Sequence, residues 1–136
     1  MNRKGFTLVE LLAVIVLIAV ITLITIPSIK YASKRIQQKN YETKVKLIKA
    51  AAEEYGDDYK EIILYSSTNT YTNPSDGQTY PSMTIHVNDL LLNGYLTYDS
   101  GETGQVFQDP RDKSDMRYKS MIIYIKNNNP YVVLDF

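Results

Sequence analysis

The pattern of hydrophobic and polar positions begins with one long apolar run. From Phe6 to Ile26 there are 21 consecutive residues, and the polar ones among them are Thr7, Glu10, Thr22 and Thr25. A helix rises about 1.5 Å per residue, so this run would be about 30 Å long, which matches the hydrocarbon core of a bilayer. The run therefore predicts a membrane-spanning helix at the start of the chain.

Beyond Pro27 the pattern becomes that of an amphipathic helix. Steps of three and four residues place six side chains on one helical face: Tyr41, Val45, Ile48, Ala52, Tyr55 and Tyr59. A proline inside a helix removes one hydrogen bond and bends the helix, and we predict that the helix bends at Pro27 and continues. The pattern predicts one helix from about Phe6 to Tyr55, and it leaves open an extension through Gly56 to about Leu64.

The remaining residues predict short elements separated by polar loops. Ser66 to Ser82 has the composition of a loop, with a turn at Asn73–Gly77. A short helix is expected from Asn88, as its N-cap residue, to Asn93, with Gly94 just past its end. Strands are expected at Met83–Val87, Tyr118–Lys126 and Tyr131–Phe136, the last two joined as a hairpin by residues 127–130. The predicted fold class is α+β, with a long N-terminal helix, transmembrane in its first half, packed on a small antiparallel β-sheet domain.

Composition argues against catalysis. The net charge is zero, with 15 basic and 15 acidic residues, and the chain has no cysteine and one histidine, His86. Without a cysteine or a second histidine, the usual nucleophile–base pairs and zinc sites cannot be built. We therefore expect a structural or surface role for His86, no cofactor and no metal site.

A charged loop from Asp99 to Asp115 offers the one alternative to this expectation. Three of its aspartates, Asp109, Asp112 and Asp115, supply the oxygen ligands that calcium prefers. The loop lacks the spacing of an EF-hand, and basic residues stand among the acids: Arg111, Lys113 and Arg117. A solvated loop is the favoured interpretation, and a calcium site is the alternative.

Charge is unevenly distributed along the amphipathic region. From Lys30 to Lys49 there are seven basic residues and one acid, whereas Glu53 to Glu61 holds five acids and one base. The basic stretch has three interpretations: a solvated helix face, a contact with anionic lipid headgroups, or a pairing with the acidic stretch of a neighbouring copy. DNA is a further possible partner that the pattern does not support, because the charges are spread around the helix without interleaved aromatic residues.

Glu10 is the unusual residue of the apolar run. An ionisable side chain inside an apolar helix is costly, so it usually faces a partner. Alternatively, a glutamate this close to the helix end can reach the headgroup layer with its carboxylate. The residues alone leave both interpretations open.

The segment around Glu10 carries a recognisable motif. The letters RKGFTLVELL resemble the processing site of a type IV prepilin, with matches at Gly5, Phe6, Thr7, Leu8, Glu10 and Leu11. Arg3 and Lys4 form the basic leader, and Pro27 stands where many pilins have a proline. The resemblance implies that a membrane-embedded prepilin peptidase cuts after Gly5 and methylates the new amine of Phe6. It also implies that Glu10 pairs with this amine in a neighbouring subunit and sets the register of assembly.

The resemblance also divides the chain and implies its function. It implies a leader peptide at residues 1–5, a transmembrane and assembly helix at 6–27, an amphipathic continuation at 28–64 and a small globular domain at 65–136. The protein would be a structural subunit, not an enzyme, of a type IV pilus or a type II secretion-like filament. Its partners would be copies of itself and other pilins, the prepilin peptidase, the assembly machinery, and membrane lipid before assembly.

The implied location is a single-pass membrane protein that later joins a filament on the cell surface. The N-terminus would be cytoplasmic and the C-terminal domain extracellular, although a count of basic residues around the span favours the opposite orientation. The short helix and the final hairpin are similar to those of small pilins and pseudopilins of Gram-positive bacteria. Two alternatives stay open: a minor pilin or competence pseudopilin for DNA uptake, and a monomeric signal-anchored surface protein that binds a ligand.

Overall fold

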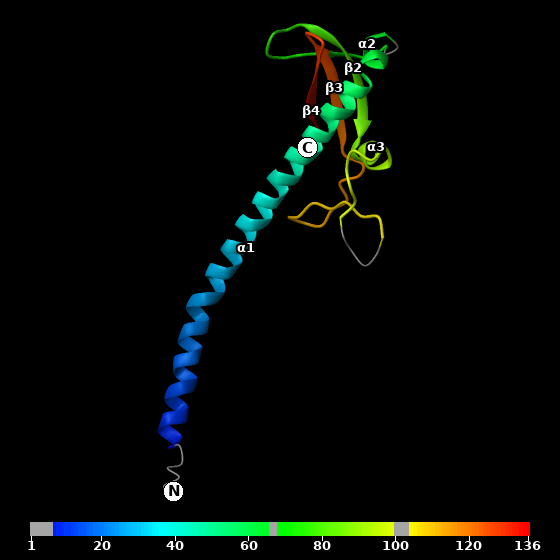
Figure 1. The fold of residues 1–136 in the computed structure, drawn as a ribbon. Coiled ribbons are helices and arrows are strands. Elements are labelled where there is room, and N and C mark those ends of the chain that lie inside the picture. Colours follow the sequence, from blue (N-terminus) through cyan, green and yellow to red (C-terminus); the bar gives the residue numbers. More distant parts are fainter. Residues whose placement is uncertain (1–6, 66–67, 100–103) are drawn as a thin grey trace. The chain divides into compact units, whose positions relative to one another are not determined.

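The computed structural model describes residues 7–65, 68–99 and 104–136, with the backbone alone described at 24–28. The chain divides into two compact units, Met1–Lys39 and Asn40–Phe136, which are described separately. The elements are α1 (Leu8–Asp58), α2 (Lys60–Tyr65), β1 (Thr70–Thr72), β2 (Thr79–His86), α3 (Val87–Leu92), β3 (Ser120–Lys126) and β4 (Asn129–Leu134), and all except β1 are labelled in Figure 1.

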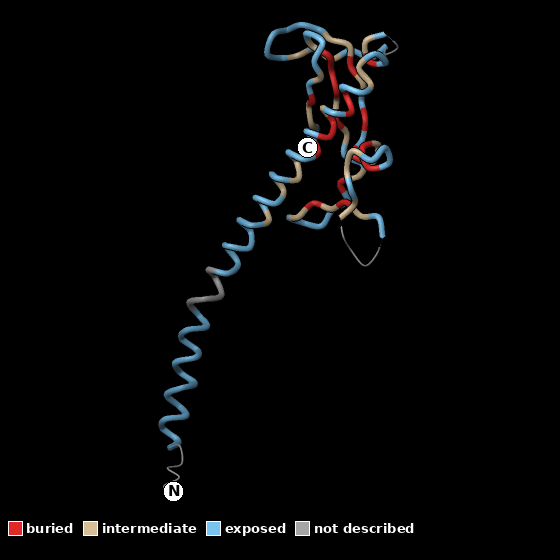
Figure 2. Tube along the Cα trace, in the orientation of Figure 1, coloured by how far each residue is buried: buried red, intermediate tan, exposed pale blue. Residues whose placement is uncertain are grey.

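Helix α1 carries the whole apolar run that the structure describes. It is unbroken from Leu8 to Asp58, so the predicted continuation of the helix past Pro27 is confirmed. In the N-terminal unit the described large apolar residues are exposed (Figure 2), with exposed fractions between 46% for Val14 and 80% for Leu8. Among the described residues of this unit the apolar side chains thus stay accessible, as on a helix that packs against lipid or other helices. The bend at Pro27 stays a prediction.

The second unit is an antiparallel sheet with the last part of α1 packed on one face. The strand order is β1-β2-β3-β4, and each strand pairs with its neighbour in the antiparallel sense. The predicted helical stripe is confirmed, because Ile48 and Ala52 are fully buried against sheet residues such as Ile123. The predicted α+β class, with a long helix on a small antiparallel sheet, is therefore confirmed.

A glycine lets the helix approach the sheet closely. A Cβ atom added at Gly56 would lie 2.8 Å from Cγ2 of Ile123 and 2.8 Å from Cβ of Pro130. Both atoms are close to the backbone and have little freedom to move away. The contact is therefore closer than any other residue type at position 56 would allow.

We expect Gly56→Ala to destabilise the protein by about 2 kcal/mol, because the methyl group overpacks this contact. Helix propensity alone predicts the opposite sign, since alanine is better than glycine by about 1 kcal/mol. Urea unfolding of the full chain in detergent micelles, followed by tyrosine fluorescence, measures the difference. Ala50→Gly on the exposed side of α1 is the matched control and should lose about 1 kcal/mol. A Gly56→Ala variant more stable than the natural chain would contradict the close packing.

The end of the long helix differs slightly from the prediction. α1 runs to Asp58, and α2 resumes at Lys60 and ends at Tyr65. The amide of Tyr59 donates to the carbonyl of Tyr55 at 3.0 Å, so helical hydrogen bonds continue across the boundary. The open extension past Gly56 is thus helical, in two segments.

The region predicted as a loop contains a second hairpin. The turn predicted at Asn73–Gly77 is confirmed, because the amide of Gly77 donates to the carbonyl of Asn73 at 2.8 Å. On either side, however, β1 pairs with the start of β2, which begins four residues before the predicted strand. The polar composition did not indicate this strand pair. β1 is an edge strand, and it and the start of β2 are largely exposed or half-buried. Threonine and tyrosine are favoured on such a half-buried sheet surface.

Two turn details also differ from the predictions. The last hairpin has a two-residue connection, not four, with positive φ angles of 52° at Asn127 and 66° at Asn128, as a type I′ turn requires. The predicted N-cap at Asn88 was wrong: β2 runs directly into α3, and His86 is the N-cap residue. The carboxylate of Asp89 accepts the backbone N–H of His86 at 2.7 Å and closes this end of the helix. Gly94, with φ of 82°, follows α3 as predicted.

Candidate functional site

The start of α1 is closed by a capping box. The backbone N–H and the hydroxyl of Thr7 both donate to Oε2 of Glu10, each at 2.9 Å. In return the backbone N–H of Glu10 donates to the hydroxyl of Thr7 at 3.3 Å. The pattern Thr-x-x-Glu is a sequence signal for this arrangement, although the capping box was not among the predictions. Glu10 therefore stabilises the first turn of its own helix.

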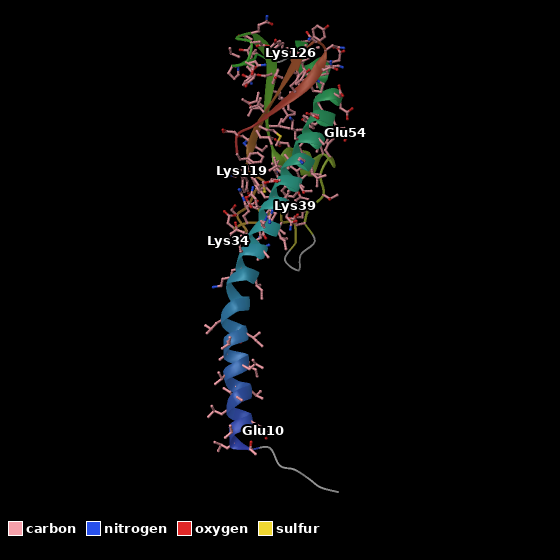
Figure 3. All side chains as sticks on the ribbon, turned by 90° about the vertical axis from the view of Figure 1, so that its left-hand side faces the viewer. Glu10, Lys34, Lys39, Glu54, Lys119 and Lys126 are labelled. Atoms are coloured by element: carbon pink, nitrogen blue, oxygen red, sulfur yellow. The ribbon has the colours of Figure 1, made fainter. Side chains whose placement is uncertain are left out.

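The carboxylate of Glu10 keeps capacity for a second partner. A carboxylate has about four acceptor positions, and both hydrogen bonds from Thr7 go to one oxygen. Among the residues that the structure describes, no donor reaches Oε1. Glu10 lies at the N-terminal end of α1 (Figure 3), next to exposed apolar side chains such as Leu11. Within the described residues, the cap therefore occupies one of the two carboxylate oxygens of Glu10.

The other residues of the predicted processing site lie outside the described part of the chain. These are Arg3, Lys4, Gly5 and Phe6. The structure therefore places Glu10 and Thr7 and leaves the cleavage and methylation site as a prediction. The backbone at Pro27 is helical, and its side chain is likewise outside the description.

Lys44 joins α1 to the charged loop of the second unit. Its Nζ atom donates to both oxygens of Asp99, at 2.7 and 2.6 Å, and to the carbonyl of Gln108 at 2.7 Å. The ammonium also lies 3.9 Å from the ring centroid of Phe107. Its side chain is only 13% exposed, so this residue is not part of a solvated helix face. Lys44 is committed within its own subunit and cannot serve in charge pairing between subunits.

Asp109, which we expected in a solvated loop, is buried. It is 5% exposed and binds Arg111, with a shortest distance of 2.7 Å between Oδ2 and the guanidinium. The Arg111 hydrogen bonds hold the pKa of Asp109 below its usual range. The guanidinium of Arg111 lies 3.3 Å from the ring centroid of Tyr41, so this pair fastens the loop to α1. The solvated-loop interpretation was therefore wrong for Asp109. Its carboxylate can be buried because Arg111, two residues later, neutralises its charge.

The two other aspartates of the proposed calcium cluster are also engaged locally. Oδ2 of Asp115 lies 2.7 Å from the guanidinium Nη2 of Arg117, and Oδ1 of Asp112 accepts a hydrogen bond from the backbone N–H of Ser114 at 2.9 Å. Within the described ranges, no group of three acidic or histidine side chains is arranged to hold a metal ion. Each carboxylate thus shapes the loop, and the calcium alternative gains no support.

Tyrosine rings stack across the face of the sheet opposite α1. Each strand contributes one ring, and their centroids lie 4.9 to 5.6 Å apart: Tyr71, Tyr80, Tyr124 and Tyr131. Lys126 and Asp76 form an ion pair beside them at 2.5 Å. Cross-strand aromatic pairs of this kind stabilise an antiparallel sheet. These rings explain part of the high tyrosine content as structural.

One finding bears on the apolar segment. Within the part of the chain that the structure describes, no helical segment satisfies the length and hydropathy requirements of a membrane span.

The N-terminal residues match a known family model. Residues 1–26 match the model described as the prokaryotic N-terminal methylation motif. That motif opens directly into a long helix whose later part packs on a small antiparallel sheet. Together, the motif and the fold define a type IV pilin-like structural subunit.

Two curated proteins specify the family further. The chain is 40% identical over 100 residues to competence protein ComGC of Bacillus subtilis, a match that covers 74% of this chain and 81% of that protein. It is 39% identical over 59 residues to ComG operon protein 3 homolog of Bacillus licheniformis, covering 43% of this chain and 61% of that protein. The chain therefore belongs to the ComGC family of competence pseudopilins. No solved structure matches it significantly.

Proposed function

We propose that the chain is made as a prepilin, cut between Gly5 and Phe6, and methylated on the new amine of Phe6 by a prepilin peptidase. The observation that carries this proposal is the methylation motif at residues 1–26, within which helix α1 begins at Leu8. Cleavage before the apolar run leaves that run on the mature protein. Gly5 suits a protease cleft because its backbone has no side chain to exclude it.

Before assembly the apolar run anchors the subunit in the membrane. The support is the sequence from Phe6 to Ile26, together with the exposed apolar side chains of α1. The N-terminus lies in the cytoplasm, where Arg3 and Lys4 hold it, and the domain lies outside the cell. For this orientation we give the prepilin motif more weight than the basic residues that follow the span, which favour the opposite orientation.

Assembly then replaces lipid contacts with contacts between helices. The methylated amine of Phe6 keeps its charge, and Oε1 of Glu10, which accepts neither hydrogen bond from Thr7, offers this amine an acceptor in the neighbouring subunit. Pairing of two opposite charges in a low-dielectric layer fixes the axial register of the helices. Repetition of this head-to-tail contact without closure produces a filament. A bend at Pro27 helps α1 pack within it.

The names of the relatives indicate the process that the filament serves. One relative is called a competence protein, and the other is named for the ComG operon. We propose that this chain is a structural subunit of a competence pseudopilus used in DNA uptake, and that it has no enzymatic role. Its partners are copies of itself, other pilins, the prepilin peptidase and the assembly machinery. Direct contact with DNA is not part of the proposal.

Mass spectrometry tests processing and assembly together. We expect the protein from the cell envelope, and from material sheared off the cell surface, to begin at N-methylated Phe6. Cells that lack the prepilin peptidase are the control and should contain the chain beginning at Met1 in the envelope alone. A Met1 chain in cells with active peptidase would overturn the proposal and favour a monomeric anchored protein. A processed chain confined to the membrane would overturn the surface filament and indicate a rare minor subunit.

A further inference from the structure

A group of three cations and one tyrosine follows the apolar run. These residues, here called the basic patch, are Lys30, Tyr31, Lys34 and Arg35. All four are exposed on the continuous helix α1, and Tyr31 is 73% exposed. Among the described residues, none of the three cations forms an ion pair, unlike Lys44. Figure 3 shows Lys34 on this part of the helix.

No acid on the same helix neutralises this patch. Between Glu10 and Glu42 the sequence contains no aspartate or glutamate. The nearest carboxylate along the chain is therefore seven residues after Arg35, about two helical turns away. The three positive charges remain available to an external anion.

The height of the patch along the helix agrees with the headgroup layer of a bilayer. Because the helix is continuous, Lys30 lies about 6 Å beyond Ile26 and Arg35 about 14 Å beyond it. The headgroup layer occupies about 5 to 8 Å on each side of the hydrocarbon core. Lysine and arginine side chains are long enough to reach back into that layer.

The composition of the patch is also that of a membrane interface. Tyrosine is enriched at this depth, because its ring lies at the headgroup level and its hydroxyl meets water. Lysine and arginine next to a span attract anionic lipids. Tyr31 thus points independently to the same surroundings as the three cations.

We propose that the basic patch binds the headgroups of anionic lipids on the outer side of the membrane before the subunit is extracted. The inference rests on the membrane anchor described under Proposed function. It gives the basic stretch a specific partner, anionic phospholipid. It also explains why cations follow this span although they oppose its orientation: they hold the subunit at a fixed depth. The lipids must be released when the subunit enters a filament.

Energy transfer to labelled lipids tests the proposal on the full chain. The sequence has no cysteine, so Ser33→Cys introduces a single site for a donor dye. The labelled chain is reconstituted, at a low protein-to-lipid ratio, in phosphatidylcholine vesicles that contain phosphatidylglycerol. A trace of either lipid carries an acceptor dye on its acyl chain. We expect enrichment of phosphatidylglycerol around residue 33, up to about fivefold for each cation. The preference should fall in 0.5 M salt, which screens charges within about 4 Å.

Variants assign the lipid preference to its residues. Replacement of Lys30, Lys34 and Arg35 by glutamine should abolish it. The matched control removes three exposed cations elsewhere, by Lys46→Gln, Lys49→Gln and Lys113→Gln, and should retain it. Equal transfer to both lipids, or a preference that survives the patch substitutions, would overturn the inference. Failure of the chain to float with vesicles of any composition would instead overturn the membrane anchor itself.

Discussion

Replacing Glu10 by glutamine is expected to prevent filament assembly while leaving the start of α1 intact. Glutamine is isosteric with glutamate and can still accept the hydrogen bonds of Thr7, as in other capping boxes. It cannot, however, neutralise the amine of Phe6 in a neighbouring subunit. Because each 1.4 kcal/mol is a factor of ten, loss of this charge pair in a low-dielectric layer should lower the yield of sheared filaments by about tenfold or more. DNA uptake should fall with it.

The experiment also needs a second variant, Glu10→Val, and a control substitution at an exposed glutamate elsewhere in the chain. Glu10→Val removes both the cap and the charge, and should fail to assemble as Glu10→Gln does. Glu54→Gln, on the exposed side of the second unit, is the control and should assemble normally. Normal filaments from Glu10→Gln together with their loss in Glu10→Val would show that Glu10 acts as a helix cap alone. Normal filaments from both variants would remove Glu10 from assembly altogether.

Lys44→Glu is expected to destabilise the second unit by about 3 kcal/mol. The substitution places a carboxylate beside Asp99 and the carbonyl of Gln108, where three acceptors would face one another. Breaking a buried ion pair costs about 3 to 5 kcal/mol, and we take the lower end because the side chain of Asp99 is 36% exposed. Urea unfolding of the full chain in detergent micelles, followed by tyrosine fluorescence, measures the loss.

Lys46→Glu is the matched control, because it reverses a charge two positions away on the exposed side of α1. It should change the free energy of unfolding by no more than about 0.5 kcal/mol. The exchange Lys44→Asp with Asp99→Lys should recover part of the lost stability. Equal effects of Lys44→Glu and Lys46→Glu would contradict the proposed attachment of the loop to the helix. The contrast also means that charge reversal at Lys44 cannot test contacts between subunits.

The long helix and the core could be predicted because each depends on a strong local pattern. The spacing of Ile48, Ala52 and Tyr55 identified the buried face, and the final hairpin followed from two apolar runs separated by asparagines. The strand pair β1–β2 could not be predicted in the same way. β1 has only three residues, and the part of β2 that pairs with it, Thr79–Pro81, ends in a proline, so neither segment is long enough to show the alternation of apolar and polar positions that indicates a strand.

The candidate site was predicted only in part. The motif identified Glu10, but its bond with Thr7 was overlooked although the Thr-x-x-Glu spacing was visible. The role of Lys44 had no local signal, because its partner Asp99 is 55 residues away in the sequence. In the sequence, Lys44 cannot be distinguished from the other basic residues of its stretch. Only the fold shows that it binds Asp99. Long sequence separation thus explains why the contact of Lys44 could not be predicted.

The proline of β4 has a consequence for how the domains behave when crowded. Lys126 and Asn129 flank the two-residue turn and form a hydrogen-bonded pair, so the next pair, Ile125 and Pro130, is not hydrogen-bonded. The nitrogen of Pro130 therefore faces the open edge of the sheet and has no hydrogen to offer an incoming strand. A filament concentrates many identical domains, a condition in which free sheet edges readily template aggregation. Pro130 hinders such edge-to-edge growth, which favours ordered association through the helices.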